Sequence, residues 1–418
     1  MLQKGYRQLP GAFFAFSLFF LANFSAFISV IWLIPTLVLI ESIVWLALAG
    51  IALWLLSRRD RLVMFFENLK KNWIILPFFI FSGLSIFWSV YWQISLYRWL
   101  ILLCTLITGG YIGMRYSIQD ILRILSFVGI FILFLSSILI IFVPSVGVMN
   151  YHSIQGAWKG VYWHKNHLGL IATFINILFL INIIDSWKSR KKHLFIWVPL
   201  YFCALLFVYK SGSVAAYLTT LCLHGLILLA LAWLKFRQKL HRFHYLLFAL
   251  VLLIAGFSLY FGADRFLAIF NRNESLTGRV PMWTYLFNTY ISKRLFGGYG
   301  FNAFWYIYSH RVAMGLAAGY PDPIVIADNG FIDILVNTGL GGFLLFLVYY
   351  LGAWWHSIRQ AGKAKDITGI FPLVLMSFTL LANISWSLIF ENQSFFTLII
   401  VSILFCISGN SLMDRSGQ

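Results

Sequence analysis

Charged side chains are scarce in this sequence, and acidic ones are the scarcest. Of 418 residues, 11% are Asp, Glu, Lys or Arg, and Asp and Glu together number 13. In contrast, 61% of the residues are hydrophobic and the mean hydropathy is +0.86. A water-soluble fold needs a polar shell that this composition cannot supply. The sequence therefore excludes an ordinary soluble protein and predicts that lipid surrounds most of the chain.

Cysteine is rare, and the cysteines have neither the spacing of a metal site nor that of a disulfide framework. They all lie inside apolar runs, at Cys104, Cys203, Cys222 and Cys406. We expect them to pack between helices, and we expect no metal site. The glycines at 297, 298 and 300 do not indicate a nucleotide-binding loop, because no strand precedes them and the Walker lysine is missing.

Apolar runs long enough to cross a bilayer are abundant. A transmembrane helix takes about 20 apolar residues. The predicted spans are residues 12–34, 36–56, 73–92, 95–114, 120–143, 166–185, 194–210, 212–234, 244–262, 329–356, 367–388 and 393–410. The fold class expected is an all-α polytopic membrane protein of about twelve transmembrane helices, with one long loop that carries short amphipathic helices.

The net charge of +18 reports topology, because most of the 31 basic residues lie in alternate connectors. Cytoplasmic loops retain Lys and Arg during insertion, so we expect both termini inside and segment 263–328 outside. Anionic membrane lipids account for the surplus charge, and no nucleic acid is expected as a partner. The single membrane domain then consists of residues 1–262 with nine spans, the outer loop 263–328, and residues 329–418 with three spans.

Ionisable residues near the spans gather at their predicted outer ends. A charged residue within a span raises the free energy of membrane insertion by about 3 kcal/mol. A shared location of several such residues therefore indicates a common role. The residues at the outer ends are Glu41, Arg98, Lys210, Asp333 and Glu391, and His224, in the middle of a span, is the main exception. Each could instead extend to the headgroups or pair with a neighbour.

Two outer loops add cations. Residues 144–165 lead into a stretch with His164, Lys165 and Asn166, and the long loop carries six basic residues: Arg265, Arg272, Arg279, Lys293, Arg294 and Arg311. Guanidinium and ammonium groups suit phosphate, so we infer a site for an anionic lipid headgroup facing outward. A basic loop that is merely solvated is the alternative.

The sequence of the long loop also predicts local structure. Pro281 and the amphipathic spacing of 282–294 predict an interfacial helix. The stretch 295–305, which includes Tyr299, is rich in glycine and aromatic residues and suits stacking on sugar faces. A glycine turn explains that stretch almost as well.

Four stretches carry a family resemblance. They are residues 88–89 with 95–98; 163–169; 276–279 with Trp283 and 297–301; and 328–331 with 339–342. In order, spacing and placement on one side of the membrane they resemble the O-antigen ligase and Wzy-type polymerase superfamily, especially its exopolysaccharide-polymerase branch. That resemblance covers residues 88–342.

The resemblance implies a membrane glycosyltransferase that acts on glycans linked to polyprenyl diphosphate at the outer face of the bacterial inner membrane. Arg98 and Arg279 would hold the diphosphate, with Lys165 and Lys210 as helpers and no nucleotide or redox cofactor. The acceptor would be a glycan or a lipid, and polysaccharide-assembly proteins are possible partners. Twelve spans would also suit a different class, a transporter or flippase of lipid-linked oligosaccharides.

The catalytic base is the point at which the sequence departs from the family. Ligases of this family commonly place a histidine where this chain has Asp328, before the Asn-Gly pair. We expect Asp328 to be the base, with His164, Asp333 and Glu391 as substitutes, although Asp328 could simply cap a helix. Polymerisation of repeat units is therefore favoured over transfer to lipid A core. The predicted catalytic residues are Asp328, Arg279 and His164, and the predicted substrate-binding residues are Arg98, Lys165, Asn166, Lys210, Trp283, Tyr299 and Asn329.

Overall fold

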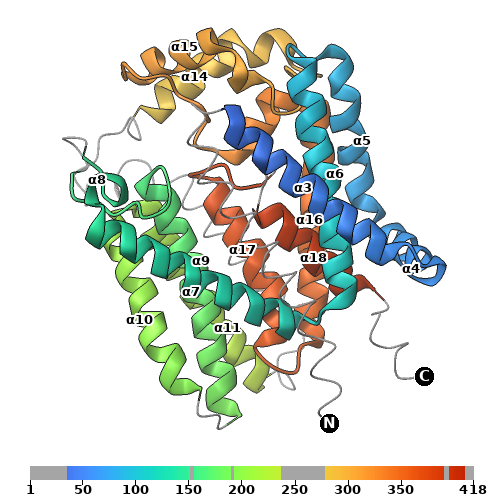
Figure 1. Ribbon diagram of the computed structural model, residues 1–418, viewed down its shortest axis with the longest axis vertical. Coiled ribbons are helices and arrows are strands. Elements are labelled where there is room, and N and C mark those ends of the chain that lie inside the picture. The colour runs from blue at the N-terminus through green and yellow to red at the C-terminus, as the bar shows by residue number, and fades with distance from the viewer. Residues whose placement is uncertain (1–34, 151–154, 190–192, 237–277, 390–394, 410–418) are drawn as a thin grey trace.

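The computed structural model describes residues 35–150, 155–189, 193–236, 278–389 and 395–409, and within these ranges the regular secondary structure is helical (Figure 1). Six of the described helices are long and apolar enough to cross a membrane. They are α6 (Trp92–Arg115), α7 (Ile118–Phe142), α9 (Lys165–Lys188), α10 (Leu194–Ser211), α11 (Val214–Phe236) and α16 (Gly330–Lys363). The expected all-α membrane fold is confirmed. The expected spans 12–34 and 244–262 lie outside the described residues, so the count of twelve stays a prediction.

The chain between 57 and 92 differs from its expected course. Residues 59–71 were expected to be a connector but form the helix α4 (Arg59–Lys71), which buries Met64 and Phe65. Asp60 in its first turn and Lys70 and Lys71 in its last turn complement the helix dipole. In place of the predicted span 73–92, the structure has a shorter helical segment that ends at Trp88. It consists of η2 (Trp73–Ile75), α5 (Leu76–Leu84) and η3 (Ser85–Trp88). The axis bends by 71° between α4 and the segment 73–88, so the two together are a seventh candidate span or a re-entrant element.

Two helices near the C-terminus are shorter than the spans predicted for them. Helix α17 (Phe371–Asn383) has 13 residues and α18 (Phe395–Ser408) has 14, so each is about 20 Å long, less than the hydrocarbon core of a bilayer. Asn383 ends α17, because its side-chain oxygen accepts the amides of Leu388 and Ile389 at 2.9 and 3.3 Å. The backbone from 384 to 389 is consequently irregular although it is largely buried.

Helix α16 is broken at Gly339, which has φ 65° and ψ −173°. The loop after η4 (Ile291–Arg294) inserts at the break, where the Leu340 amide donates to the carbonyl of Leu295. A Cβ at Gly339 would lie 2.5 Å from the Phe296 carbonyl, so only glycine fits this approach. The break therefore fixes the long loop to the start of α16.

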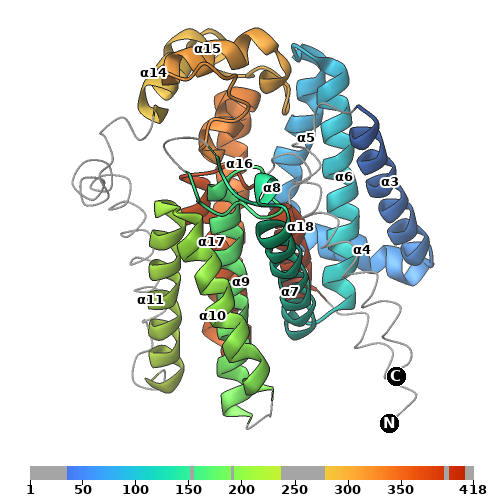
Figure 2. The same ribbon diagram turned by 60° about the vertical axis from the view of Figure 1, so that its left-hand side comes forward.

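Helices α14 (Arg279–Thr289) and α15 (Tyr308–Ala318) lie across one end of the helical bundle, which we call the capped end (Figures 1 and 2). The expected helix within 282–294 corresponds to α14 and η4. Successive long helices run in alternating directions, so that α9 and α16 begin toward the capped end and α10 ends toward it. The capped end is the one that the distribution of Lys and Arg predicts to be outside.

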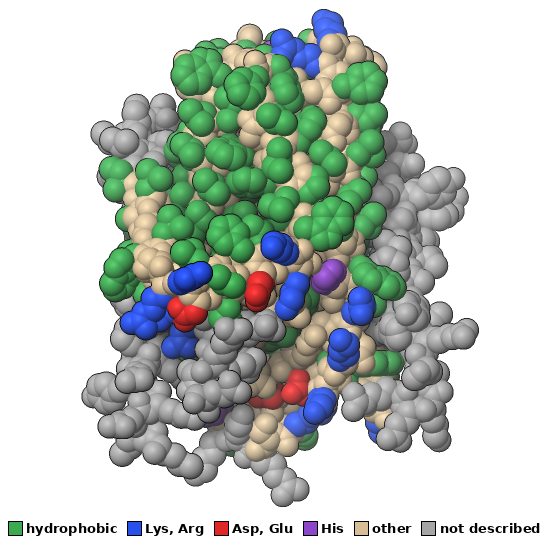
Figure 3. Space-filling model, turned by 90° about the vertical axis from the view of Figure 1, so that its right-hand side faces the viewer, with side chains coloured by type: hydrophobic (Ala, Val, Ile, Leu, Met, Phe, Trp, Pro, Cys, Tyr) green, Lys and Arg blue, Asp and Glu red, His purple; other side chains and the backbone are tan. Residues whose placement is uncertain are grey.

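The outer surface of the bundle fits a lipid environment. Figure 3 shows the side that carries α4 and α5 as a broad hydrophobic area with charged side chains above and below it. Ile80, Leu84 and Phe87 of this region are 55%, 48% and 86% exposed. Apolar patches of this extent are rare on soluble monomers. The exposed side chains therefore mark a membrane-facing surface.

The alternation predicts which cysteines a membrane-impermeant thiol reagent can reach. In a background with the four native cysteines replaced by serine, Ser292→Cys at the capped end should be labelled in intact cells. Ser57→Cys and Ser189→Cys, which are exposed at the opposite end, should be labelled only after the membrane is opened. Labelling of Ser189→Cys in intact cells, with Ser292→Cys protected, would reverse the assigned orientation.

Candidate functional site

An ion pair between Arg279 and Asp328 lies at the capped end. The Arg279 Nε and Nη2 atoms both donate to Asp328 Oδ2 at 3.0 Å. The side chains are 19% and 28% exposed, so the pair is partly shielded yet reachable. Gly278, with φ 82°, is the N-cap residue of α14. A Cβ there would lie 2.3 Å from the Ala318 carbonyl oxygen. This close packing against the end of α15 positions Arg279.

The backbone on both sides of Asp328 is fixed by side chains. On one side, the Ala327 amide donates to the carboxylate of Asp333, and the Ala327 carbonyl accepts the indole N–H of Trp283 at 2.7 Å. On the other side, Asn329 caps α16 by accepting the amides of Phe331 and Ile332. Asp328 itself has φ 52°, a left-handed conformation that aspartate tolerates better than most residues. The Asp328 carboxylate is thus directed to Arg279 while Asn329, and not Asp328, caps the helix.

Asp333 has a structural role in this arrangement. Its carboxylate accepts the Ala327 amide at 3.1 Å, the Trp305 indole N–H at 2.7 Å and the Ser387 hydroxyl. These donors come from three separate segments of the chain. Because its oxygens already accept hydrogen bonds from the protein, Asp333 has little room to accept one from a substrate hydroxyl, so we propose that it positions Asp328.

His164, at the start of α9, lies close enough to the ion pair for both of its charges to act on the imidazole. Its Nδ1 accepts the Asn166 amide at 3.2 Å, so His164 caps α9. Burial lowers the pKa of His164 to about 4; the negative charge of Asp328 opposes this shift, and the positive charges of Lys165, Arg279 and Lys159 add to it. The ring is therefore neutral at pH 7. Because Nδ1 is the acceptor, the hydrogen-bond pattern assigns the remaining proton to Nε2, which makes His164 a donor.

The predicted residues near His164 fall into two groups. Lys165 is buried and its Nζ donates to the Gly212 carbonyl at 2.6 Å, which ties α9 to the turn between α10 and α11. Asn166 is half-buried beside it. In contrast, Lys210 is exposed, and its Nζ lies 6.0 Å from the ring of the adjacent Tyr209. No contact given by the structure joins Lys210 to Arg279 or Asp328 within the described residues.

Arg98 and Tyr299 lie in a neighbouring part of the capped end. Arg98 is 4% exposed in α6, and its guanidinium donates to the hydroxyl of Tyr306 and packs over that ring. Tyr299 is 7% exposed, in a cluster with Tyr290 and Phe304, and its hydroxyl donates to the Tyr290 carbonyl. Tyr299 holds the cap together in this conformation, and its ring is not presented for stacking on a sugar.

Residues 199–347 match the family model described as O-antigen ligase. Over this segment, about a third of its length, the chain is similar to the O-antigen ligase family. The match includes Arg279, Trp283 and Asp328, and it confirms the resemblance to the O-antigen ligase and Wzy-type superfamily. Members of this family are membrane glycosyltransferase-like enzymes. A comparison with curated proteins found no match.

Outside the matched segment, the site includes residues that the sequence did not point to. Trp386 stacks on His164, with ring centroids 5.7 Å apart and planes 13° from parallel. Ser387 binds Asp333, and the Ile384 carbonyl accepts the Asn329 side chain at 3.2 Å. The predicted span 367–388 treats this segment as ordinary helix. The substitute base Glu391 lies outside the described residues.

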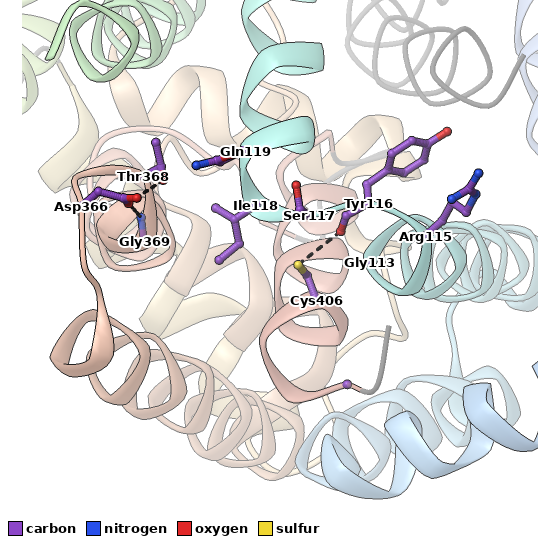
Figure 4. A pocket seen from close by; sticks show the side chains of 11 residues that line it. Gly113, Arg115, Tyr116, Ser117, Ile118, Gln119, Asp366, Thr368, Gly369 and Cys406 are labelled. Atoms are coloured by element: carbon purple, nitrogen blue, oxygen red, sulfur yellow. Dashed lines mark hydrogen bonds between the residues drawn. The ribbon is translucent and has the colours of Figure 1, made fainter. Parts of the chain in front are cut away.

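A pocket of about 380 Å³ lies at the opposite end, and it is not part of this family site. Its lining includes Arg115, Tyr116, Asp366, Thr368 and Cys406. Figure 4 shows Arg115 and Tyr116 pointing away from Asp366, whose carboxylate already accepts the Thr368 hydroxyl at 2.6 Å. No group of three or more His, Cys, Asp or Glu residues that could hold a metal occurs in the described ranges.

Removing one oxygen from Asp333 tests its positioning role. Asp333→Asn places an amide N–H₂ group against donors, so it should lower the thermal midpoint in detergent by several degrees, equivalent to about 2–3 kcal/mol. The matched control Asp322→Asn, at an exposed position, should leave the midpoint unchanged. An Asp333→Asn midpoint equal to that of the control would contradict the role.

The lowered pKa of His164 predicts a pH dependence of stability. Between about pH 4 and the ordinary value of 6.5, the folded protein binds fewer protons at His164 than the unfolded chain does. Its contribution to stability is therefore complete above pH 6.5 and is lost as the pH falls toward 4. His164→Asn, which keeps a good helix cap, should reduce the loss of thermal midpoint between pH 7.5 and pH 5. The control His193→Asn, at an exposed cap of α10, should not change it.

Proposed function

We propose that this chain transfers glycans from a polyprenyl diphosphate carrier at the outer face of the bacterial inner membrane, and that it polymerises exopolysaccharide or O-antigen repeat units. The observation that carries the proposal is the partly exposed Arg279–Asp328 pair within the O-antigen ligase segment. An arginine fork that already binds a carboxylate through two nitrogens has the geometry to bind phosphate. The pair therefore combines an anion-binding group with a base.

The proposed reaction begins when Arg279 exchanges one anionic partner, Asp328, for another, the diphosphate of the carrier. The carrier diphosphate competes with Asp328 for the guanidinium, which leaves the Asp328 carboxylate able to accept a proton. The acceptor hydroxyl oxygen then forms a bond to the anomeric carbon as the bond from that carbon to the diphosphate oxygen breaks. The hydroxyl proton goes to Asp328, and the electron pair stays on the diphosphate, where Arg279 stabilises it.

The aspartate at 328 favours polymerisation. Family ligases commonly have a histidine there, so an acidic residue in its place supports an acceptor other than lipid A core. Transfer to lipid A core remains the second candidate, because the family model that matches is itself described as O-antigen ligase.

A flippase has weaker support. A transport path needs polar groups deep in the bundle that a substrate can use. His224, the mid-span histidine, is already bonded to the Tyr201 hydroxyl at 2.9 Å and to the Thr220 carbonyl at 2.8 Å. Its polar atoms are thus engaged within the protein.

Complementation of a deletion strain tests the function. Arg279→Ala and Asp328→Asn should each reduce long-chain polysaccharide by about a hundredfold or more, because each removes stabilisation of the transition state. Arg279→Lys should restore little, since it keeps the charge but loses the fork. The control Lys293→Ala removes an exposed cation from the same segment and should have no effect.

The pattern of products separates the candidates, once immunoblots show equal amounts of each variant in the membrane. Single repeat units left on carrier or core support the polymerase, and long chains stranded on the carrier support the ligase. Normal polymer from both Arg279→Ala and Asp328→Asn would refute glycosyl transfer at this pair.

A further inference from the structure

The segment 384–389 packs against the residues that flank Asp328, the acidic partner in the ion pair with Arg279. It is irregular, yet three anchors fix it: Asn383 accepts the amides of Leu388 and Ile389, Asn329 donates to the Ile384 carbonyl, and Ser387 donates to Asp333. Non-helical backbone within a membrane protein occurs where it is buried in protein or lines a polar cavity. Its position beside His164 connects this segment to the proposed reaction.

Trp386 is the side chain that these anchors present. It is 6% exposed, and its ring contacts His164 at 5.7 Å and His167 at 5.6 Å between centroids. Its indole N–H is buried and has no hydrogen-bond partner in the part of the chain that the structure describes. Buried indole N–H groups usually have a partner, so this donor needs an explanation.

Four other indoles of the described chain show the usual behaviour. Their Nε1 atoms donate to nearby oxygens: Trp88 to Gly297, Trp99 to Phe79, Trp283 to Ala327 and Trp305 to Asp333. Trp386 differs from these four, and it is the one that stacks on a predicted catalytic residue. A ligand oxygen would complete its bonding.

We propose that Trp386 contacts the substrate, with its indole N–H and the Nε2–H of His164 donating to oxygens of the diphosphate that Arg279 holds. This proposal rests on the proposed function and adds two neutral donors to its site. The two rings are parallel within 13°, which places both donors on neighbouring planes. Diphosphate oxygens only accept hydrogen bonds, so they match a site in which indole, imidazole and guanidinium all donate.

Binding of short-chain analogues to the full chain in nanodiscs tests the proposal. Affinities for farnesyl diphosphate and farnesol are measured by calorimetry for the wild type, Trp386→Phe, Trp99→Phe and Arg279→Ala. Trp386→Phe keeps an aromatic ring against His164 but removes the N–H. We expect it to weaken farnesyl diphosphate binding about tenfold, as loss of a hydrogen bond to a charged group does, with an unchanged thermal midpoint. Trp99→Phe, whose indole faces Phe79 instead, should bind as the wild type does.

The outcomes separate a failure of the Trp386 contact from a failure of the proposed function. If Arg279→Ala weakens diphosphate binding and Trp386→Phe does not, the Trp386 contact is refuted and the proposed function stands. If Trp386→Phe weakens the binding of farnesol and of farnesyl diphosphate equally, the indole packs against the lipid chain and the diphosphate contact is wrong. If the wild type binds farnesyl diphosphate no better than farnesol, both the contact and the proposed diphosphate site fail.

Discussion

The hydrogen bonds of the Asp333 carboxylate are the interaction on which the capped end depends. It joins the cap through Trp305, the loop before α16 through Ala327, and the segment after α17 through Ser387. An unpaired carboxylate in such a place would be strongly unfavourable, whereas three donors make it a rigid joint. The geometry of Asp328, one residue beyond Ala327, follows from this joint. A structural aspartate therefore holds the chemically available one in its left-handed conformation.

Breaks in the helices supply the rest of the site. The break at Gly339 admits the loop that follows η4, and the end of α17 at Asn383 turns the next six residues into irregular backbone. Regular spans would fill the bundle with apolar side chains and present no polar groups at this depth. Here the interrupted helices bring His164, Arg279, Asp328 and Trp386 to one end of the bundle. Irregular backbone and polar chemistry thus occur together, as expected inside a membrane protein.

Much of this arrangement could be predicted from the sequence because hydrophobic length and charge are local properties. The helices α6, α7, α9, α10 and α11 lie within a few residues of their predicted positions. Arg279 and Asp328 were identified through motifs, and their contact across 49 residues agrees with a shared site. Helix α4 was missed because its charges indicate a loop as readily as an amphipathic helix. Trp386 was missed because the composition of an apolar run does not reveal where Asn383 will interrupt the helix.

The central claim is that glycosyl transfer releases a diphosphate carrier, and the stoichiometry of the purified protein in proteoliposomes measures this most directly. With a lipid-linked repeat unit as donor and acceptor, we expect one polyprenyl diphosphate to be released for each new glycosidic bond, and none from the Arg279→Ala protein. Movement of intact lipid-linked glycan across the bilayer without release of the carrier would contradict it.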